Sequence, residues 1–113
     1  MKMVMALVRN ERLHHVREAL LKAGITGFTV SATLGMGELR KLRASPGREE
    51  LVQHIRVEVA VPDTWADRAV EVLRDASATG YPGDGVIFVY NLDRAVKIRS
   101  GREREGILIP GPM

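Results

Sequence analysis

Val52-Gln-His-Ile-Arg-Val-Glu-Val-Ala-Val61 is the stretch that decides the fold of this chain. From Ile55 onward, apolar side chains alternate with more polar ones, which predicts a strand with one buried and one exposed face. Pro62 and Asp63 follow directly and predict the start of a helix, with Asp63 as its cap. Apolar residues at helical spacing then mark the buried side of that helix: Trp65, Ala69, Val72, Leu73 and Ala76.

A second strand is expected on the other side of this helix. Residues 77–84 contain a glycine-rich turn, and Gly85–Tyr90 is an apolar run rich in β-branched and aromatic residues. Residues 52–90 are therefore predicted to form one strand–helix–strand unit. A short fifth strand is expected at Ala95–Arg99, followed by a C-terminal tail at 101–113.

The N-terminal part of the chain repeats the same order of elements. Residues 2–9 are apolar between Lys2 and Arg9, as expected of a strand buried on both faces. Asn10 is expected to cap the N-terminus of a helix. This helix is expected to end before Gly24, because glycine is the preferred residue directly after a helix C-terminus. Residues 27–34 alternate and predict another strand. The helix has an apolar stripe: Leu13, Val16, Leu20 and Ala23.

Together the two halves predict an α+β fold of the ferredoxin-like βαββαβ type, with a long exposed loop at 36–53 between its second and third strands. Both helices are expected to cover the same side of the sheet. The first strand nevertheless has apolar residues on both faces. Met3, Met5 and Leu7 form one row, and Val4, Ala6 and Val8 form the other. An apolar row left in water usually marks an interface, so we expect a homo-oligomer that buries the open sheet face.

Length and composition exclude several classes of protein. The 113 residues suffice for one domain, 1–113, and the absence of cysteine excludes disulfides and thiolate chemistry and fits a cytoplasmic location. No apolar run approaches the roughly 20 residues that cross a bilayer, so the apolar N-terminus is interpreted as a strand. The net charge of +3 permits an anionic partner, but the 4% content of aromatic residues argues against nucleic acid, whose binding needs rings that stack on bases.

The run Gly80-Tyr-Pro-Gly-Asp-Gly85 indicates an anion-binding turn. Glycines let the backbone approach a ligand, and successive N–H groups form a concavity that suits phosphate. Lys97 and Arg99 are alternate residues, so on a strand both would project from one face. Each feature also has a simpler interpretation. Asp84 commonly closes such a turn by bonding its own backbone, and the two cations are equally typical of a solvated edge.

With these motifs in order, the chain resembles the PII nitrogen-regulatory signalling family over nearly its whole length. The matching segments are Val16-Arg-Glu-Ala-Leu20, Gly24-Ile-Thr-Gly-Phe-Thr-Val30, Gly35-Met-Gly37, Glu58-Val-Ala-Val-Pro62, Gly80 with Gly83-Asp-Gly85, Ile87-Phe-Val89 and Val96-Lys-Ile-Arg-Ser-Gly101. Their order and spacing agree with the family except inside the loop.

The resemblance implies a non-enzymatic homotrimer whose three clefts each bind an adenine nucleotide, ATP, ADP or AMP. Carried over by position, the nucleotide-binding residues are Thr29, Gly35, Gly37, Glu58, Gly83, Asp84, Gly85, Lys97 and Arg99. The backbone amides and the cations of one cleft would come from different chains. The long loop would regulate a partner, commonly a transporter, an enzyme or a transcriptional regulator, and its basic residues are Arg40, Lys41, Arg43 and Arg48. These cations either dock an acidic partner surface or keep the loop soluble.

Several positions depart from the usual pattern of the family. Val86 replaces the lysine that follows the glycine turn, and Lys97 stands where arginine is usual. Leu39 and His54 replace a glutamine and a lysine that help to hold 2-oxoglutarate with magnesium in the family, so we expect that site to be absent. The loop also contains no tyrosine, so the usual uridylylation acceptor is missing.

The alternative function is a metal-binding or metal-tolerance module on the same trimeric architecture. His14 and His15 suggest it, but adjacent helical residues diverge by about 100° and do not easily share one ion. An RNA-binding ferredoxin-like domain is a third possibility, which the scarcity of aromatic residues disfavours. Glu58 has no nucleophile or second acid at a useful spacing, so the sequence offers no catalytic constellation.

Overall fold

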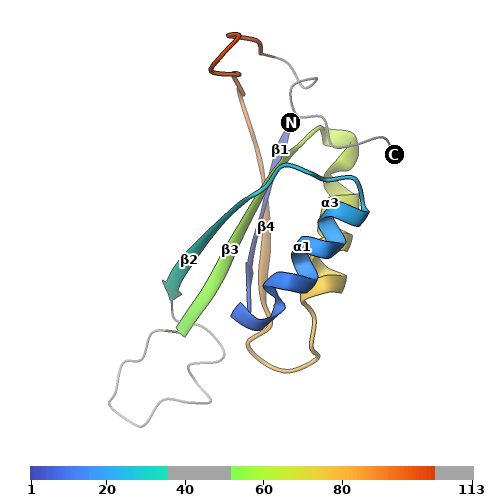
Figure 1. Ribbon diagram of the computed structural model, residues 1–113, viewed down its shortest axis with the longest axis vertical. Coiled ribbons are helices and arrows are strands. Elements are labelled where there is room, and N and C mark those ends of the chain that lie inside the picture. Colours follow the sequence, from blue (N-terminus) through green and yellow to red (C-terminus); the bar gives the residue numbers. More distant parts are fainter. Residues whose placement is uncertain (36–51, 104–113) are drawn as a thin grey trace.

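The computed structural model describes residues 1–35 and 52–103, and it has the predicted order of elements (Figure 1). Strand β1 (Lys2–Val8) leads through the 3-10 turn η1 (Asn10–Arg12) into helix α1 (Leu13–Lys22) and strand β2 (Thr29–Gly35). Strand β3 (Val52–Val61) leads through η2 (Asp63–Trp65) into helix α3 (Ala66–Ser77) and strand β4 (Gly85–Asn91). The four strands form one antiparallel sheet in the order β2-β3-β1-β4.

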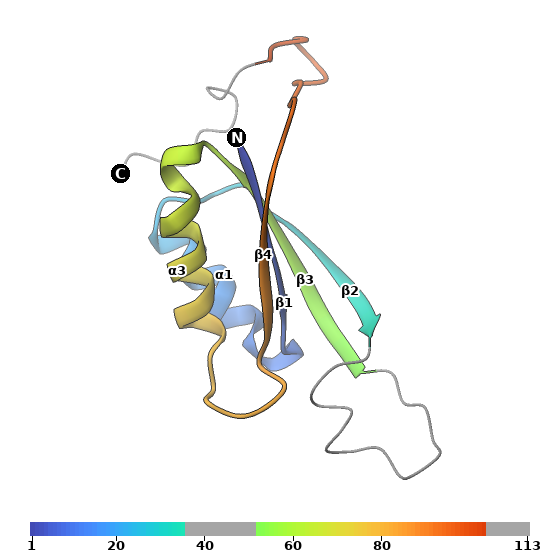
Figure 2. The same cartoon turned by 180° about the vertical axis from the view of Figure 1, so that it is seen from behind.

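Both helices lie on the same face of this sheet, as the sequence predicts (Figures 1 and 2). The core is formed where alternate residues of β1 and β3 meet the apolar stripes of the helices. The buried apolar residues are Val4, Ala6, Val8, Val16, Leu20, Ile25, Ile55, Val57, Val59, Val61, Trp65, Ala66, Ala69 and Leu73. Each fully buried Val or Leu side chain stabilises the fold by about 1.5–3 kcal/mol relative to exposure in water.

The helix termini follow the sequence only in part. Gly24 has a φ of 86°, and the N–H groups of Gly24 and Ile25 bond to Leu21 O at 3.0 Å and Leu20 O at 2.9 Å. This pair of bonds is a Schellman motif and confirms glycine as the residue after α1.

The two predicted N-caps are wrong. Asn10 and Asp63 are each the first residue of a 3-10 turn, preceded by Arg9 and Pro62, and no side-chain cap bond forms. The Asp63 carboxylate instead accepts a hydrogen bond from the amino terminus of Met1 at 2.8 Å, which lowers its pKa. A partner distant in the sequence therefore competes successfully with the local cap.

The open face of the sheet is divided into an apolar half and a polar half. The register places Met5 between Phe88 of β4 and Glu58 of β3. Phe88 and Tyr90 are exposed here, and Met3, Met5 and Leu7 are only half-buried. The polar half belongs to β2 and β3, where Arg56 Nε donates to Ser31 Oγ at 3.1 Å. This arrangement matches the expectation of an apolar row that assembly would cover.

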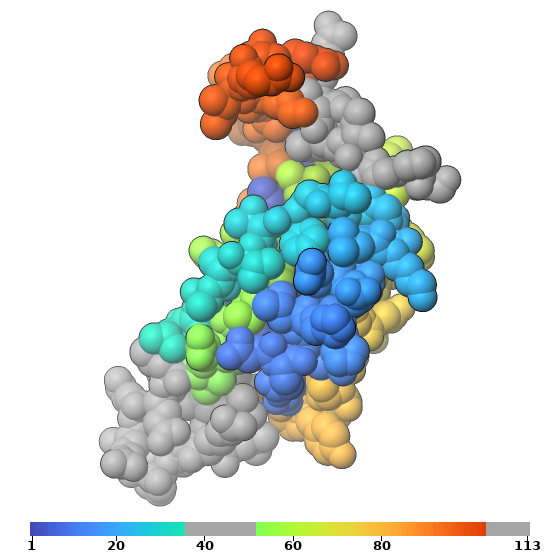
Figure 3. Space-filling model, viewed as in Figure 1, coloured from blue at the N-terminus to red at the C-terminus, as the bar shows by residue number. Residues whose placement is uncertain are grey.

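The predicted fifth strand at Ala95–Arg99 is absent. The Lys97 N–H bonds to Arg102 O and the Gly101 N–H to Lys97 O, both at 2.8 Å, so residues 97–102 form a turn with Gly101 at a φ of 70°. The Leu92 N–H still bonds to Met1 O at 3.0 Å, and beyond it the segment 93–103 stands apart from the body of the protein (Figure 3). Among the described residues it has no neighbouring strand with which to pair, which explains why the β-branched pattern does not produce a strand.

Candidate functional site

The glycine turn before β4 is organised by the carboxylate of Asp84. This group accepts hydrogen bonds from the N–H groups of Thr79 at 2.8 Å and Gly80 at 2.9 Å, and from the Thr79 hydroxyl. Its pKa falls well below the ordinary aspartate value, with the Thr79 hydroxyl bond as the largest cause. Asp84 thus closes its own turn, which was the simpler of the two interpretations of this residue.

Arg9 fixes the closed turn to the end of β1. Its Nε donates to Asp84 Oδ1 at 3.0 Å, and its Nη2 donates to Pro82 O at 2.7 Å. The Arg9 side chain is 14% exposed, so this charge-assisted pair is largely shielded from water. Arg9 is not among the site residues predicted from the sequence. Its position in the sequence could have indicated this contact. Arg9 is the first charged residue after β1, and the pairing of Val8 with Gly85 places it beside the glycine turn.

All three glycines of the turn have backbone conformations that favour glycine. Gly80 has a φ of 86°, Gly83 a φ of 95° and Gly85 a φ of 113°. A Cβ atom built on Gly85 would lie 1.7 Å from the carbonyl oxygen of Leu7. The close approach of β4 to β1 therefore requires glycine at 85, independently of any ligand.

His54 reaches the same turn from β3. Its Nε2 lies 3.4 Å from the carbonyl oxygen of Gly83, and its backbone carbonyl accepts from the Thr33 hydroxyl at 3.1 Å. In this chain the side chain therefore contacts the backbone of the glycine turn.

Thr29 and Glu58 are directly opposite each other on the open face. They are cross-strand partners of β2 and β3, with Thr29 exposed and Glu58 half-buried. The Glu58 carboxylate lies 3.3 Å from Arg56 Nε. Gly35 pairs with Val52 farther along the same strands, at the end of the sheet that carries the glycine turn. Thr29 and Glu58 are therefore at one end of β2, whereas Gly35 lies at the other end of that strand, toward the glycine turn.

The segment 92–103, which contains Lys97 and Arg99, follows the opposite end of β4 (Figures 1 and 2). The seven residues of β4 separate them from Gly85, and a strand of that length spans about 20 Å. Both side chains are exposed, and neither forms an ion pair within residues 1–35 and 52–103. One chain thus does not bring its glycine turn and these two cations together.

A pocket of about 460 Å³ opens beside the turn, between α3 and β4. Gly80, Asp84 and Val86 line it together with Arg74 and Ser77 of α3. The Ser77 hydroxyl is buried and has no hydrogen-bond partner in the described part of the chain. Among the described residues, the Ser77 hydroxyl therefore remains without a hydrogen bond next to the glycine turn at 80–85.

The rest of the predicted site lies outside the described residues. Gly37, Leu39 and the four basic loop residues fall within 36–51. Within the described ranges, no three His, Asp or Glu side chains come together as a possible metal site, and the rings of His14 and His15 are 6.0 Å apart, edge to face. No described helix has both the length and the apolar character needed to span a membrane.

Comparison with known proteins gives a consistent result along the whole chain. Residues 1–102 match the family described as Nitrogen regulatory protein P-II. A nitrogen regulatory protein P-II of Rhizobium etli is 40% identical over 105 residues, which cover 89% of this chain and 94% of that protein. The P-II protein of Haemophilus influenzae is 35% identical, covering 93% and 97% of the two chains. Nitrogen regulatory protein P-II 1 of Escherichia coli K12 is 33% identical, covering 96% and 100%.

Proposed function

The chain belongs to the nitrogen regulatory protein P-II family, whose members are non-enzymatic, nucleotide-binding signal-transduction proteins, and from this membership we propose how its own residues divide that task. The family assembles as trimers of the βαββαβ subunit. An adenine nucleotide binds in each cleft between neighbouring copies, and a partner protein responds to whether the nucleotide is bound. A nucleotide sensor of this kind acts in the cytoplasm, where adenine nucleotides are abundant.

One observation carries the division of the site between copies. The glycine turn at 80–85 and the cations Lys97 and Arg99 lie at opposite ends of β4 in one chain. A phosphate group is held more strongly where main-chain amides and positive charges converge. A neighbouring copy that places its 97–102 turn against the glycine turn would add Lys97 and Arg99 to the site.

The other predicted residues fit a nucleotide that lies along the open sheet face. Thr29 and Glu58 are the polar cross-strand pair that would meet the base and ribose, whereas Gly83, Asp84 and Gly85 would meet the phosphates. Asp84 acts mainly by holding the turn closed, since its oxygens already accept three hydrogen bonds from Thr79 and Gly80. Gly35 and Gly37 let the backbone pass close to the ligand where the long loop leaves β2.

The nucleotide preference follows from the charges near the turn. Val86 is 44% exposed and replaces the lysine usual in the family, so one phosphate-facing cation is lost. Lys97 provides a point charge in place of a planar guanidinium fork. We expect phosphates to be held less strongly than in the usual members of the family, so that ADP and AMP compete with ATP.

The regulated partner is proposed to contact the long loop at 36–53. Four cations in this loop would pair with an acidic surface on that partner, which in this family is commonly a transporter or an enzyme: Arg40, Lys41, Arg43 and Arg48. Nucleotide binding would favour one loop arrangement over the others, and the partner would distinguish between them.

Titration calorimetry with ATP, ADP and AMP tests the proposal directly. Saturable binding with one site per chain is expected, and Arg99→Ala should weaken it at least tenfold without changing the mass of the assembly. Arg17→Ala is the matched control, because Arg17 is an exposed arginine on α1 away from the proposed cleft. An absence of saturable binding at millimolar nucleotide would refute the proposal.

A further inference from the structure

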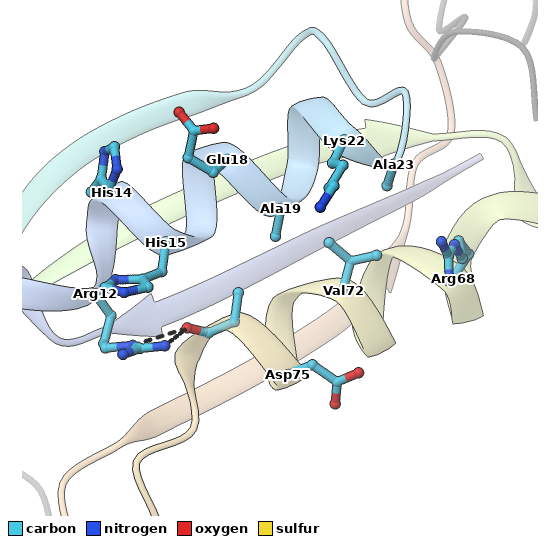
Figure 4. Close-up of a pocket in the computed structure, with 11 residues that line it drawn as sticks. Arg12, His14, His15, Glu18, Ala19, Lys22, Ala23, Arg68, Val72 and Asp75 are labelled. Carbon is cyan, nitrogen blue, oxygen red and sulfur yellow. Dashed lines mark hydrogen bonds between the residues drawn. The ribbon is translucent and has the colours of Figure 1, made fainter.

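A second surface lies on the helix layer, away from the nucleotide cleft. Helices α1 and α3 border an open groove of about 600 Å³ (Figure 4). Its floor consists of small apolar side chains: Ala19 of α1, Ala23 directly after that helix, and Val72 and Ala76 of α3. All four are only half-buried, so the packing of the two helices does not remove them from water. A floor of this kind accepts one or two apolar side chains from another molecule.

Two cationic side chains border this apolar floor, Lys22 on α1 and Arg68 on α3. Lys22 on α1 extends toward α3, and Arg68 on α3 lies one helical turn from Val72, so the two charges flank the same apolar spot (Figure 4). Both side chains are exposed, and within the described residues neither has an ion pair or a side-chain hydrogen bond. Their charge is therefore available to an incoming anion.

The other end of the groove is already occupied by an internal contact. Arg12 donates from Nε and Nη2 to Ala76 O at 3.0 and 2.7 Å, which satisfies a carbonyl at the C-terminal end of α3. Glu18 and Asp75 add negative charges along the groove. The positive charge free to recruit a ligand is therefore concentrated at Lys22 and Arg68.

We propose that this groove docks an acidic peptide segment of a partner protein. An apolar side chain of the segment packs on Ala23 and Val72, and carboxylates on either side of it pair with Lys22 and Arg68. This contact is separate from the long loop, and it lies on the opposite side of the sheet from the open face that assembly would cover. The proposal does not depend on nucleotide binding.

Other occupants fit the groove less well. A nucleic acid would find among the lining residues no phenyl, phenol or indole ring on which a base would stack. A small anion alone would remain in water in so open a groove, where exposed ion pairs contribute little. A peptide supplies both the apolar anchor and the carboxylates.

Selection from a displayed library of random 12-residue peptides tests the proposal with the full-length assembled protein. The enriched peptides should combine an apolar residue with flanking Asp or Glu. Lys22→Glu and Arg68→Glu should each weaken their binding at least tenfold in fluorescence polarisation. Arg17→Glu on α1 and Arg74→Glu on α3 make the same change of charge outside the groove, and they should leave affinity within twofold.

Three outcomes would overturn the proposal. The first is a library that yields no enriched peptide, and the second is enrichment of peptides without acidic residues. The third is binding that falls equally in the groove variants and in the control variants, which would indicate a general effect of net charge. Nucleotide titrations of Lys22→Glu, Arg68→Glu and Arg17→Glu distinguish a failure of this proposal from a failure of the proposed nucleotide site.

Discussion

The Arg9 guanidinium donates from Nε to Asp84 Oδ1 at 3.0 Å, joining the end of β1 to the turn that precedes β4. Seventy-five positions separate the two residues. Through this bond, and through the Arg9 bond to Pro82 O, one side chain fixes both the carboxylate and the backbone of the candidate phosphate turn. In the proposed nucleotide site we therefore expect Arg9 to be a positioning residue, which acts only through the shape of the turn.

Arg9→Ala should destabilise the fold and loosen the turn. Hydrogen bonds to charged groups contribute about 1.5–3 kcal/mol each, and a partly shielded Asp84 would lose its guanidinium partner. Chemical denaturation should show a loss of about 2 kcal/mol, and calorimetry should show weaker nucleotide binding. Arg17→Ala should change neither quantity. Unchanged affinity in a destabilised Arg9→Ala protein would restrict Arg9 to a role in folding.

The carboxyl of Asp84 predicts a stability that depends on acid pH. Its pKa is lowered in the folded protein from an ordinary value of 3.8, chiefly by the Thr79 hydroxyl bond. The folded state therefore binds this proton less readily than the unfolded state. The resulting stabilisation is complete above the unfolded value and is lost as the pH falls from about 4 toward the lowered pKa.

Asp84→Asn removes that titration while keeping the shape of the side chain. Denaturation midpoints measured between pH 2 and 6 should fall less steeply on acidification in the variant than in the parent protein. Asp67→Asn, an exposed aspartate on α3, serves as control. Parallel curves for the Asp84→Asn variant and the parent would contradict the assigned role of Asp84.

Gly85→Ala should severely destabilise the protein. The new Cβ would lie 1.7 Å from Leu7 O at a φ of 113°, and both the clash and the strained backbone oppose folding. We expect a loss of roughly 3 kcal/mol or more in the free energy of unfolding. Gly27→Ala is the matched control, because nothing lies within 4 Å of its Cβ position. Similar losses in the two variants would show that β4 does not approach β1 as closely as described.

A further prediction concerns 2-oxoglutarate. His54 contacts Gly83 O, and Leu39 has no group that binds a metal or a carboxylate, so the parent protein should not bind 2-oxoglutarate with ATP and magnesium. The double variant Leu39→Gln, His54→Lys should acquire measurable binding in calorimetry, and Leu39→Ala, His54→Ala should not. Binding by the parent protein would show that other residues of this chain provide the site.

Much of this architecture could be predicted from local patterns. The alternation at 55–61 and the stripe at Leu13, Val16 and Leu20 identify strands and helices because burial has a period of two in strands and 3.6 in helices. Gly24 was also predictable, since its left-handed conformation is required within a few residues of the helix end.

The errors arise where a residue has a partner distant in the chain. Asp63 bonds the amino terminus of Met1 instead of capping its own helix, and the Arg9–Asp84 contact exists only after β1 and β4 pair. The pattern at 95–99 indicates a strand, but a strand needs a neighbour, and the described part of one chain provides none. Local propensity does not contain these long-range contacts.

A mixed assembly of two variants tests whether the nucleotide site is divided between copies. Asp84→Ala disables the turn and Arg99→Ala removes a cation, so each variant alone should lose nucleotide binding. Co-expressed with different affinity tags and purified as mixed trimers, they should regain binding, because one cleft then combines an intact turn from one copy with intact cations from its neighbour. Calorimetry should then show one high-affinity nucleotide site per mixed trimer. Mixed trimers that bind no better than either variant alone would contradict the division of the site between copies.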